Sequence, residues 1–191
     1  MSMLSREEIQ LKMETYRKAM FVRNPITRFL SLYLSKFVTS SLKTRSTWEE
    51  YIGTSIIARY RKNSMEHKLQ YKLNLNITFY EFSSYIVDVT SNYAIDEITD
   101  HWLPMHKSCD PCRFKPDFIG YFEELETEGP YLLQWLGIDG AVQLPKYHVS
   151  TTGSQLRNEY SKIGRNKLRK LINYYAHDYN LFGYSTEAYL L

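Results

Sequence analysis

The sequence has few cysteines, and they form a single C-x-x-C pair, Cys109 and Cys112. Such a pair by itself is compatible with half a zinc site, a redox pair, a disulfide or two free thiols. No second C-x-x-C pair and no nearby H-x-x-x-H pattern completes a zinc site, and no βαβ pattern surrounds the pair as in redox enzymes. We therefore predict that the protein holds no metal.

The sequence also lacks long apolar runs and a strong excess of either charge. No stretch is long and apolar enough to span a membrane, and Met1–Arg6 does not resemble a signal peptide. Lysine and arginine number 24 against 21 acidic residues. This small basic excess suits a phosphorylated nucleotide or an acidic glycan and is too weak to indicate nucleic acid. Length and composition are typical of one globular domain over residues 1–191.

The most informative stretch is residues 19–37, which predicts a short strand, Ala19–Val22, turning sharply into a helix. Asn24 is a suitable cap for that helix, and Pro25 suits its first position because its φ is already helical. At 100° per residue, one face of the helix is apolar and the other is polar. The apolar face contains Ile26, Phe29, Leu30, Tyr33, Leu34 and Phe37, and the polar face contains Thr27, Arg28, Ser31 and Ser35.

Arg23 stands where this strand ends and the helix begins. In open α/β sheets that position collects phosphates, through unpaired backbone N–H groups, the helix dipole and a basic side chain. Arg23 and Ser31 are therefore candidate phosphate ligands. The alternative is that Arg23 is a surface arginine and Ser31 a solvated helix residue.

Further helices and one further strand follow from caps and periodicity. Three capping boxes, at residues 5–8, 47–50 and 78–81, predict helix starts. Residues 118–122 form an apolar strand, and residues 127–136 form a helix closed by Gly137. We expect a loop over residues 139–157 and a last helix over residues 167–176. The fold class is α/β, with a small, mostly parallel sheet.

Four segments carry a family resemblance. They are Phe21–Phe37, Asp100–Pro104 with the C-x-x-C pair, Asp117–Leu125 and Asp178–Tyr184. Together they resemble the Golgi carbohydrate sulfotransferases of the chondroitin, dermatan and HNK-1 types, and the resemblance extends from Glu8 to Ser185. It implies a P-loop-like sulfotransferase fold in which helices flank the sheet.

The resemblance implies a substrate pair and three functional residues. The sulfate donor would be PAPS (3′-phosphoadenosine 5′-phosphosulfate), and the acceptor a glycan of chondroitin, dermatan, N-linked or O-linked type. Arg23 and Ser31 match the residues that hold the 3′-phosphate of PAPS. His101 is the one histidine within a family motif and is our candidate catalytic base. The alternative is that His101 is a structural residue beside Trp102.

The resemblance also implies a location and two covalent features. The family resides in the Golgi membrane and acts on its luminal side, where Cys109 and Cys112 would form a disulfide. Asn76–Thr78 is a glycosylation sequon, so the chain would be a glycoprotein if the sequon is used. Thr78 also belongs to a capping box, so the sequon is equally explained by that cap.

The family opens its catalytic domain with a strand, loop and helix that cradle the 5′-phosphosulfate, and nothing before Phe21 resembles that segment. We therefore expect the chain as given to transfer sulfate poorly. Two alternative functions stay open. One is a catalytically inactive member that binds nucleotide or glycan, and the other is a luminal phosphate-binding or interaction module without nucleotide.

Overall fold

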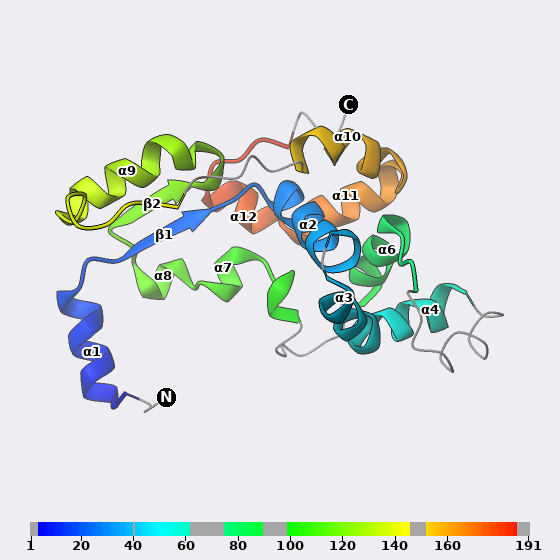
Figure 1. Cartoon of the computed structure of the whole chain (residues 1–191), viewed down its shortest axis with the longest axis horizontal. Coiled ribbons are helices and arrows are strands. Elements are labelled where there is room, and N and C mark those ends of the chain that lie inside the picture. Colours follow the sequence, from blue (N-terminus) through cyan, green and yellow to red (C-terminus); the bar gives the residue numbers. More distant parts are fainter. Residues whose placement is uncertain (1–3, 40, 62–74, 90–98, 146–151, 187–191) are drawn as a thin grey trace. The chain divides into compact units, whose positions relative to one another are not determined.

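The computed structural model describes residues 4–39, 41–61, 75–89, 99–145 and 152–186 (Figure 1). Its contacts divide the chain into two compact units, each built from two separate stretches. The first unit comprises Met1–Asn24 with Met105–Val149, and the second comprises Pro25–Pro104 with Ser150–Leu191. Single-domain folding of residues 1–191 stays a prediction. No helix in the described ranges has the length and apolarity needed to cross a membrane.

The first unit contains a two-stranded parallel sheet, β1 (Ala19–Val22) and β2 (Phe118–Tyr121). The predicted bounds of β1 are confirmed, and β2 ends one residue earlier than predicted. Helix α9 (Leu125–Leu136) packs against β2, where Phe118 contacts the rings of Tyr131 and Trp135 at centroid distances of 6.1 Å (Figure 1). This helix-flanked parallel pair confirms the predicted α/β class.

The remaining helices of the first unit are short or exposed. Helix α1 (Arg6–Thr15) begins with the predicted capping box, in which the Ser5 hydroxyl accepts from the Glu8 N–H. None of its side chains is buried.

Helix α9 begins two residues earlier than predicted and is preceded by a 3₁₀ turn, η4 (Phe122–Glu124). It ends at Gly137, whose φ of +74° confirms the predicted left-handed cap.

The disulfide implied by the family resemblance is not formed in the structure. Cys109 and Cys112 are exposed free thiols. Cys109 follows α7 (Met105–Ser108), whereas Cys112 lies within α8 (Pro111–Phe114). Between them Asp110 takes a left-handed φ of +42°, so the chain turns before Pro111 starts the second helix. Cys109 therefore lies between the two short helices, whereas Cys112 belongs to the second.

Helix α2 (Pro25–Tyr33) is the centre of the second unit, and a π-helical segment, η1 (Leu34–Val38), continues it. All six side chains of its predicted apolar face are buried. Phe29 stacks on Phe82 at 5.1 Å between ring centroids and contacts Phe79 at 5.9 Å. The sequence pattern therefore identified the main core face of this unit.

The capping box predicted at residues 47–50 is wrong. Helix α3 (Leu42–Trp48) begins earlier, where the Ser41 hydroxyl accepts from the Thr44 N–H. It runs without a break into a π-helical segment, η2 (Glu49–Gly53), and then α4 (Thr54–Tyr60). Thr47 is therefore inside a helix, and its hydroxyl donates to the Lys43 carbonyl. A suitable cap sequence does not start a helix when the preceding turn is already helical.

The capping box at residues 78–81 is confirmed at the start of α6 (Phe79–Val89). Its Glu81 carboxylate also pairs with Arg61, which follows α4. The same Arg61 guanidinium donates to the carbonyls of Leu75 and Asn76, each at 3.0 Å. One ion pair thus fixes the approach to α6 as well as its first turn.

The last part of the second unit is more helical than predicted. Helix α10 (Thr152–Ser161) occupies the end of the expected loop, so the loop prediction is wrong from residue 152 onward. Buried Tyr160 gives the reason, since its hydroxyl donates to the Ile26 carbonyl at 2.9 Å and α10 packs against α2 (Figure 1). Helix α11 (Arg165–Tyr174) follows with the predicted inward residues buried, and α12 (Ala176–Leu181) ends the fold. A 3₁₀ turn, η3 (Thr99–His101), leads into the Trp102–Pro104 segment.

Substitution of Gly120 by alanine tests the sheet. Gly120 lies opposite Phe21, and an added Cβ would stand 2.4 Å from the Phe21 ring and 2.9 Å from the Glu128 carboxylate. We expect a loss of about 1–3 kcal/mol of unfolding free energy through overpacking. Gly140→Ala is the matched control, because its added Cβ would meet nothing within 4 Å. Urea unfolding followed by circular dichroism measures both, and equal midpoints for the two variants would contradict the strand register.

Candidate functional site

Arg23 follows directly after β1 in the first unit. Arg23 and Phe122 directly follow the last paired residues of the two strands, Val22 and Tyr121. The Arg23 guanidinium carbon lies 4.5 Å from the centroid of the Phe122 ring. Stacking uses the face of the guanidinium, whereas its hydrogen bonds lie in the plane. The contact therefore suits an arginine that binds an anion through its edge.

The backbone at Asn24 differs from the sequence-based expectation. Its N–H donates to the Glu123 carboxylate at 2.9 Å, and Asn24 is buried. We expected the N–H groups at the start of α2 to be unpaired and open to phosphate. In the structure the Asn24 N–H is used by Glu123, a contact that sequence reasoning missed because the two residues are 99 positions apart.

Ser31 lies on α2 in the second unit and is half-buried. One turn earlier on the same polar face, Arg28 donates to the Leu103 carbonyl at 2.8 Å and to the His101 carbonyl at 3.4 Å. The structure thus ties the segment that carries His101 to the helix that carries Ser31. Arg28 was placed on the polar face by the sequence, but its partners, more than 70 positions away, were not visible there.

His101 is exposed, and its aromatic contact is with Trp48 instead of Trp102. The imidazole and indole meet edge to face at 4.8 Å between centroids, and the Lys36 ammonium lies 5.0 Å from the same indole ring. Trp102 is buried, and its carbonyl accepts the Tyr175 hydroxyl at 2.6 Å. We considered that His101 is a structural residue beside Trp102. In the structure its imidazole contacts Trp48, and it is the Trp102 backbone that makes the buried hydrogen bond of this segment.

The surroundings of His101 lower its pKa. Although His101 is exposed, the neighbouring groups remove part of its hydration, which disfavours the charged imidazolium; the positive charges of Lys36 and Arg28 act in the same direction, while Asp100 opposes them. A lowered pKa keeps the imidazole neutral at neutral pH. A neutral imidazole can accept a proton, which is the property that a general base needs.

Comparison with known proteins identifies the family. The family model described as the Sulfotransferase family matches residues 1–185 of the 191. The chain belongs to this family. Carbohydrate sulfotransferase 14 of Danio rerio is 34% identical over 188 residues, which are 96% of this chain and 48% of the relative. Carbohydrate sulfotransferase 11 of Mus musculus is 31% identical over 185 residues, 96% of this chain and 51% of the relative.

Carbohydrate sulfotransferase 10 of Rattus norvegicus shows 30% identity over 197 aligned positions, covering 100% of this chain and 53% of the relative. The chain therefore spans about half the length of the curated relatives that it matches. No solved structure matches it. The family resemblance found in the sequence motifs is confirmed, and with it the sulfotransferase fold class.

In this member of the sulfotransferase family, the three predicted functional residues fall in both units. Ser31 and His101 belong to the second unit, where Arg28 connects α2 with the backbone of residues 101–103. Arg23 belongs to the first unit, where Phe122 holds it. The functional roles of these three residues stay predictions.

The titration of His101 tests its electrostatic environment. We expect its pKa, measured by NMR and assigned with His101→Gln, to lie below the ordinary value of about 6.5. Lys36→Met removes a charge that disfavours the imidazolium, so it should raise that pKa. Lys162→Met is the control, because Lys162 pairs with Glu159 at 2.6 Å and does not act on His101.

The sign of the accompanying stability change follows from the same shift. The unfolded chain binds a proton at His101 more readily than the folded chain does, so this group favours folding above its unfolded pKa. That contribution should decline as the pH falls through the ordinary value toward the lowered one. A His101 pKa that is unchanged or lower in Lys36→Met would contradict the proposed effect of Lys36.

Proposed function

We propose that this chain acts in carbohydrate sulfation, with PAPS as the sulfate donor and a glycan hydroxyl as the acceptor. The observation that carries the proposal is the match to the sulfotransferase family over residues 1–185. Relatives named as carbohydrate sulfotransferases narrow the acceptor to a glycan. A location on the luminal side of the Golgi membrane belongs to the same proposal, by resemblance to the family.

We propose that Arg23 and Ser31 bind the 3′-phosphate of the donor. A guanidinium binds phosphate with two parallel, charge-assisted hydrogen bonds, and a serine hydroxyl adds a third donor. The contact with Phe122 supports this role for Arg23, because it restricts the arginine side chain before any ligand arrives. The half-buried position of Ser31 on the polar face of α2 supports the role of the serine.

His101 is proposed as the general base. In sulfuryl transfer the acceptor oxygen forms a bond to sulfur, the bond from sulfur to the phosphate oxygen of the donor breaks, and the acceptor proton passes to a base. The lowered pKa of His101 keeps its imidazole ready to take that proton. Arg28 is a positioning residue, because it holds the backbone of residues 101–103 through two carbonyls.

Nucleotide binding tests the phosphate ligands. Calorimetry should show tighter binding of adenosine 3′,5′-bisphosphate than of adenosine 5′-phosphate. Arg23→Ala should remove about 1.5–3 kcal/mol of that binding, the value of a charge-assisted contact. Ser31→Ala should weaken binding by about 0.5–1.5 kcal/mol. Ser35→Ala, exposed and one turn further along the chain, is the matched control and should bind like the parent.

Equal affinity for the two nucleotides would contradict recognition of the 3′-phosphate. An Arg23→Ala protein that binds like the parent would contradict the assignment of Arg23 alone. The alternative of a phosphate-binding module without nucleotide predicts that inorganic phosphate competes as well as the bisphosphate does.

Sulfate transfer tests the catalytic part of the proposal. Radiolabelled PAPS is supplied with desulfated chondroitin, dermatan and N-glycan acceptors, and turnover distinguishes a transferase from a member that only binds. Where turnover occurs, His101→Gln should lower it by roughly a hundred- to ten-thousandfold without weakening bisphosphate binding. Turnover should also decline as the pH falls through the lowered pKa of His101, because the protonated imidazole cannot act as a base.

A further inference from the structure

The indole of Trp48 joins two groups of the candidate site to the core of the second unit. Trp48 ends α3 and is only 9% exposed, and it contacts Phe37 of the core at 6.3 Å between ring centroids. The His101 imidazole lies against the same indole at 4.8 Å, and the Lys36 ammonium lies 5.0 Å from its centroid. The three groups come from α3, η3 and η1, and the proposed reaction assigns Trp48 no role.

The backbone of His101 is fixed, but its ring needs a support of its own. Arg28 donates to the His101 carbonyl at 3.4 Å, a bond that does not limit rotation of the imidazole about its side-chain torsions. An edge-to-face contact does limit that rotation, because it fixes the distance and the tilt of two rings, here 77°. Trp48 is buried and His101 is exposed, so the indole is the support and the imidazole is the group that it orients.

The same indole keeps Lys36 close to His101. An ammonium near an aromatic face is attracted by the electron-rich face of the ring. Loss of hydration is the main cause of the lowered His101 pKa, and the charges of Lys36 and Arg28 add to it, while Asp100 opposes it. Trp48 contributes to two of these causes, because its ring displaces water from the imidazole and holds the Lys36 charge nearby.

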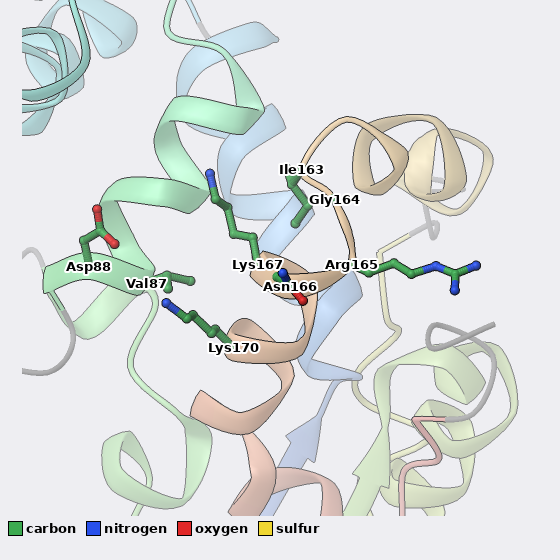
Figure 2. Close-up of a pocket in the computed structure, with 8 residues that line it drawn as sticks. All are labelled: Val87, Asp88, Ile163, Gly164, Arg165, Asn166, Lys167 and Lys170. Carbon is green, nitrogen blue, oxygen red and sulfur yellow. The ribbon is translucent and has the colours of Figure 1, made fainter.

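Other lysines of the second unit do not share a ring with His101. Lys167 and Lys170 line a cavity of about 320 Å³ between the end of α6 and the start of α11 (Figure 2). The Lys167 ammonium lies 3.4 Å from the centroid of the Tyr80 ring, and Figure 2 shows the Lys170 side chain directed toward α6. Neither charge contributes to the shift of the His101 pKa. Lys170 therefore offers a control lysine outside the Trp48 cluster.

We propose that Trp48 is a positioning residue, whose indole orients the His101 imidazole for proton transfer and holds the Lys36 ammonium beside it. The inference rests on the proposed function in one respect, namely that His101 takes the proton of the acceptor hydroxyl as the hydroxyl oxygen bonds to sulfur. Trp48 acts through His101 and does not itself contact the substrate. The role needs an aromatic ring, so phenylalanine should fulfil it in part and leucine should not.

Tryptophan fluorescence of the full chain tests the contact without any turnover. A protonated imidazole against an indole quenches its fluorescence, so the emission should fall as the pH drops through the lowered pKa of His101. His101→Gln and Trp48→Phe should each remove this step. Trp135→Phe is the matched control, because Trp135 belongs to the first unit, and it should retain the step. A step that survives in Trp48→Phe, or the absence of a step in the parent, would overturn the inference.

Turnover and the titration of His101 test the positioning itself. Trp48→Leu should lower turnover by up to about a hundredfold, the effect of a misplacement of about 1 Å, and leave the Kd for adenosine 3′,5′-bisphosphate unchanged. It should also raise the His101 pKa toward its ordinary value, so the acid limb of the pH–rate profile should move to higher pH. Trp48→Phe should keep most of the turnover, and Lys170→Met should change neither property. A loss of folded protein would lower turnover without moving the His101 pKa.

The positioning role and the proposed function can fail separately. If His101→Gln abolishes turnover while Trp48→Leu turns over and titrates like the parent, the positioning role is overturned and the general base stands. If His101→Gln leaves turnover unchanged while the fluorescence step depends on both residues, the general base is refuted and the Trp48 contact is supported.

Discussion

Burial of the apolar face of α2 is the constraint on which the second unit depends. Phe29 contacts Phe79 and Phe82 of α6 and Tyr175, which lies between α11 and α12. Aromatic pairs of this kind add about 0.5–1.5 kcal/mol each beyond the area that they bury. Because this face is fixed against the core, the opposite face of the same helix is fixed as well. The positions of Arg28 and Ser31 therefore depend on packing in which their own side chains take no part.

The same packing explains why His101 has an altered pKa while it stays exposed. Its backbone is held by Arg28 and, one residue on, by the buried Tyr175 hydroxyl on the Trp102 carbonyl. The imidazole is left on the outside, against the edge of Trp48 and near the Lys36 charge. A rigid backbone with an accessible ring suits the general base proposed above, because the ring must reach a substrate hydroxyl to take its proton without moving its support.

Charge placement matters more in this protein than net charge. The chain carries only three more basic than acidic residues. Even so, Lys167 and Lys170 lie near one another at the start of α11, and the charge of Lys36 acts on His101. The Arg23 guanidinium lies against the Phe122 ring, and the Lys167 ammonium is held by the Tyr80 ring and the Ser84 hydroxyl. Ordering by aromatic rings preserves positive charge that an ion pair would cancel.

The features that depend on residues near one another in the chain could be predicted from the sequence alone. Periodicity and hydrogen bonding within a few positions predict strand Ala19–Val22, the buried face of α2, the capping boxes at Ser5 and Thr78 and the cap at Gly137. Packing between distant elements is needed to explain why Thr47 lies inside a helix and why residues 152–161 are helical, and the free state of Cys109 and Cys112 is seen in the structure alone. It also placed Glu123 on the Asn24 N–H and Trp48 against His101. These contacts join residues that are distant in the chain, so they depend on which elements pack together. Local propensity does not predict that packing.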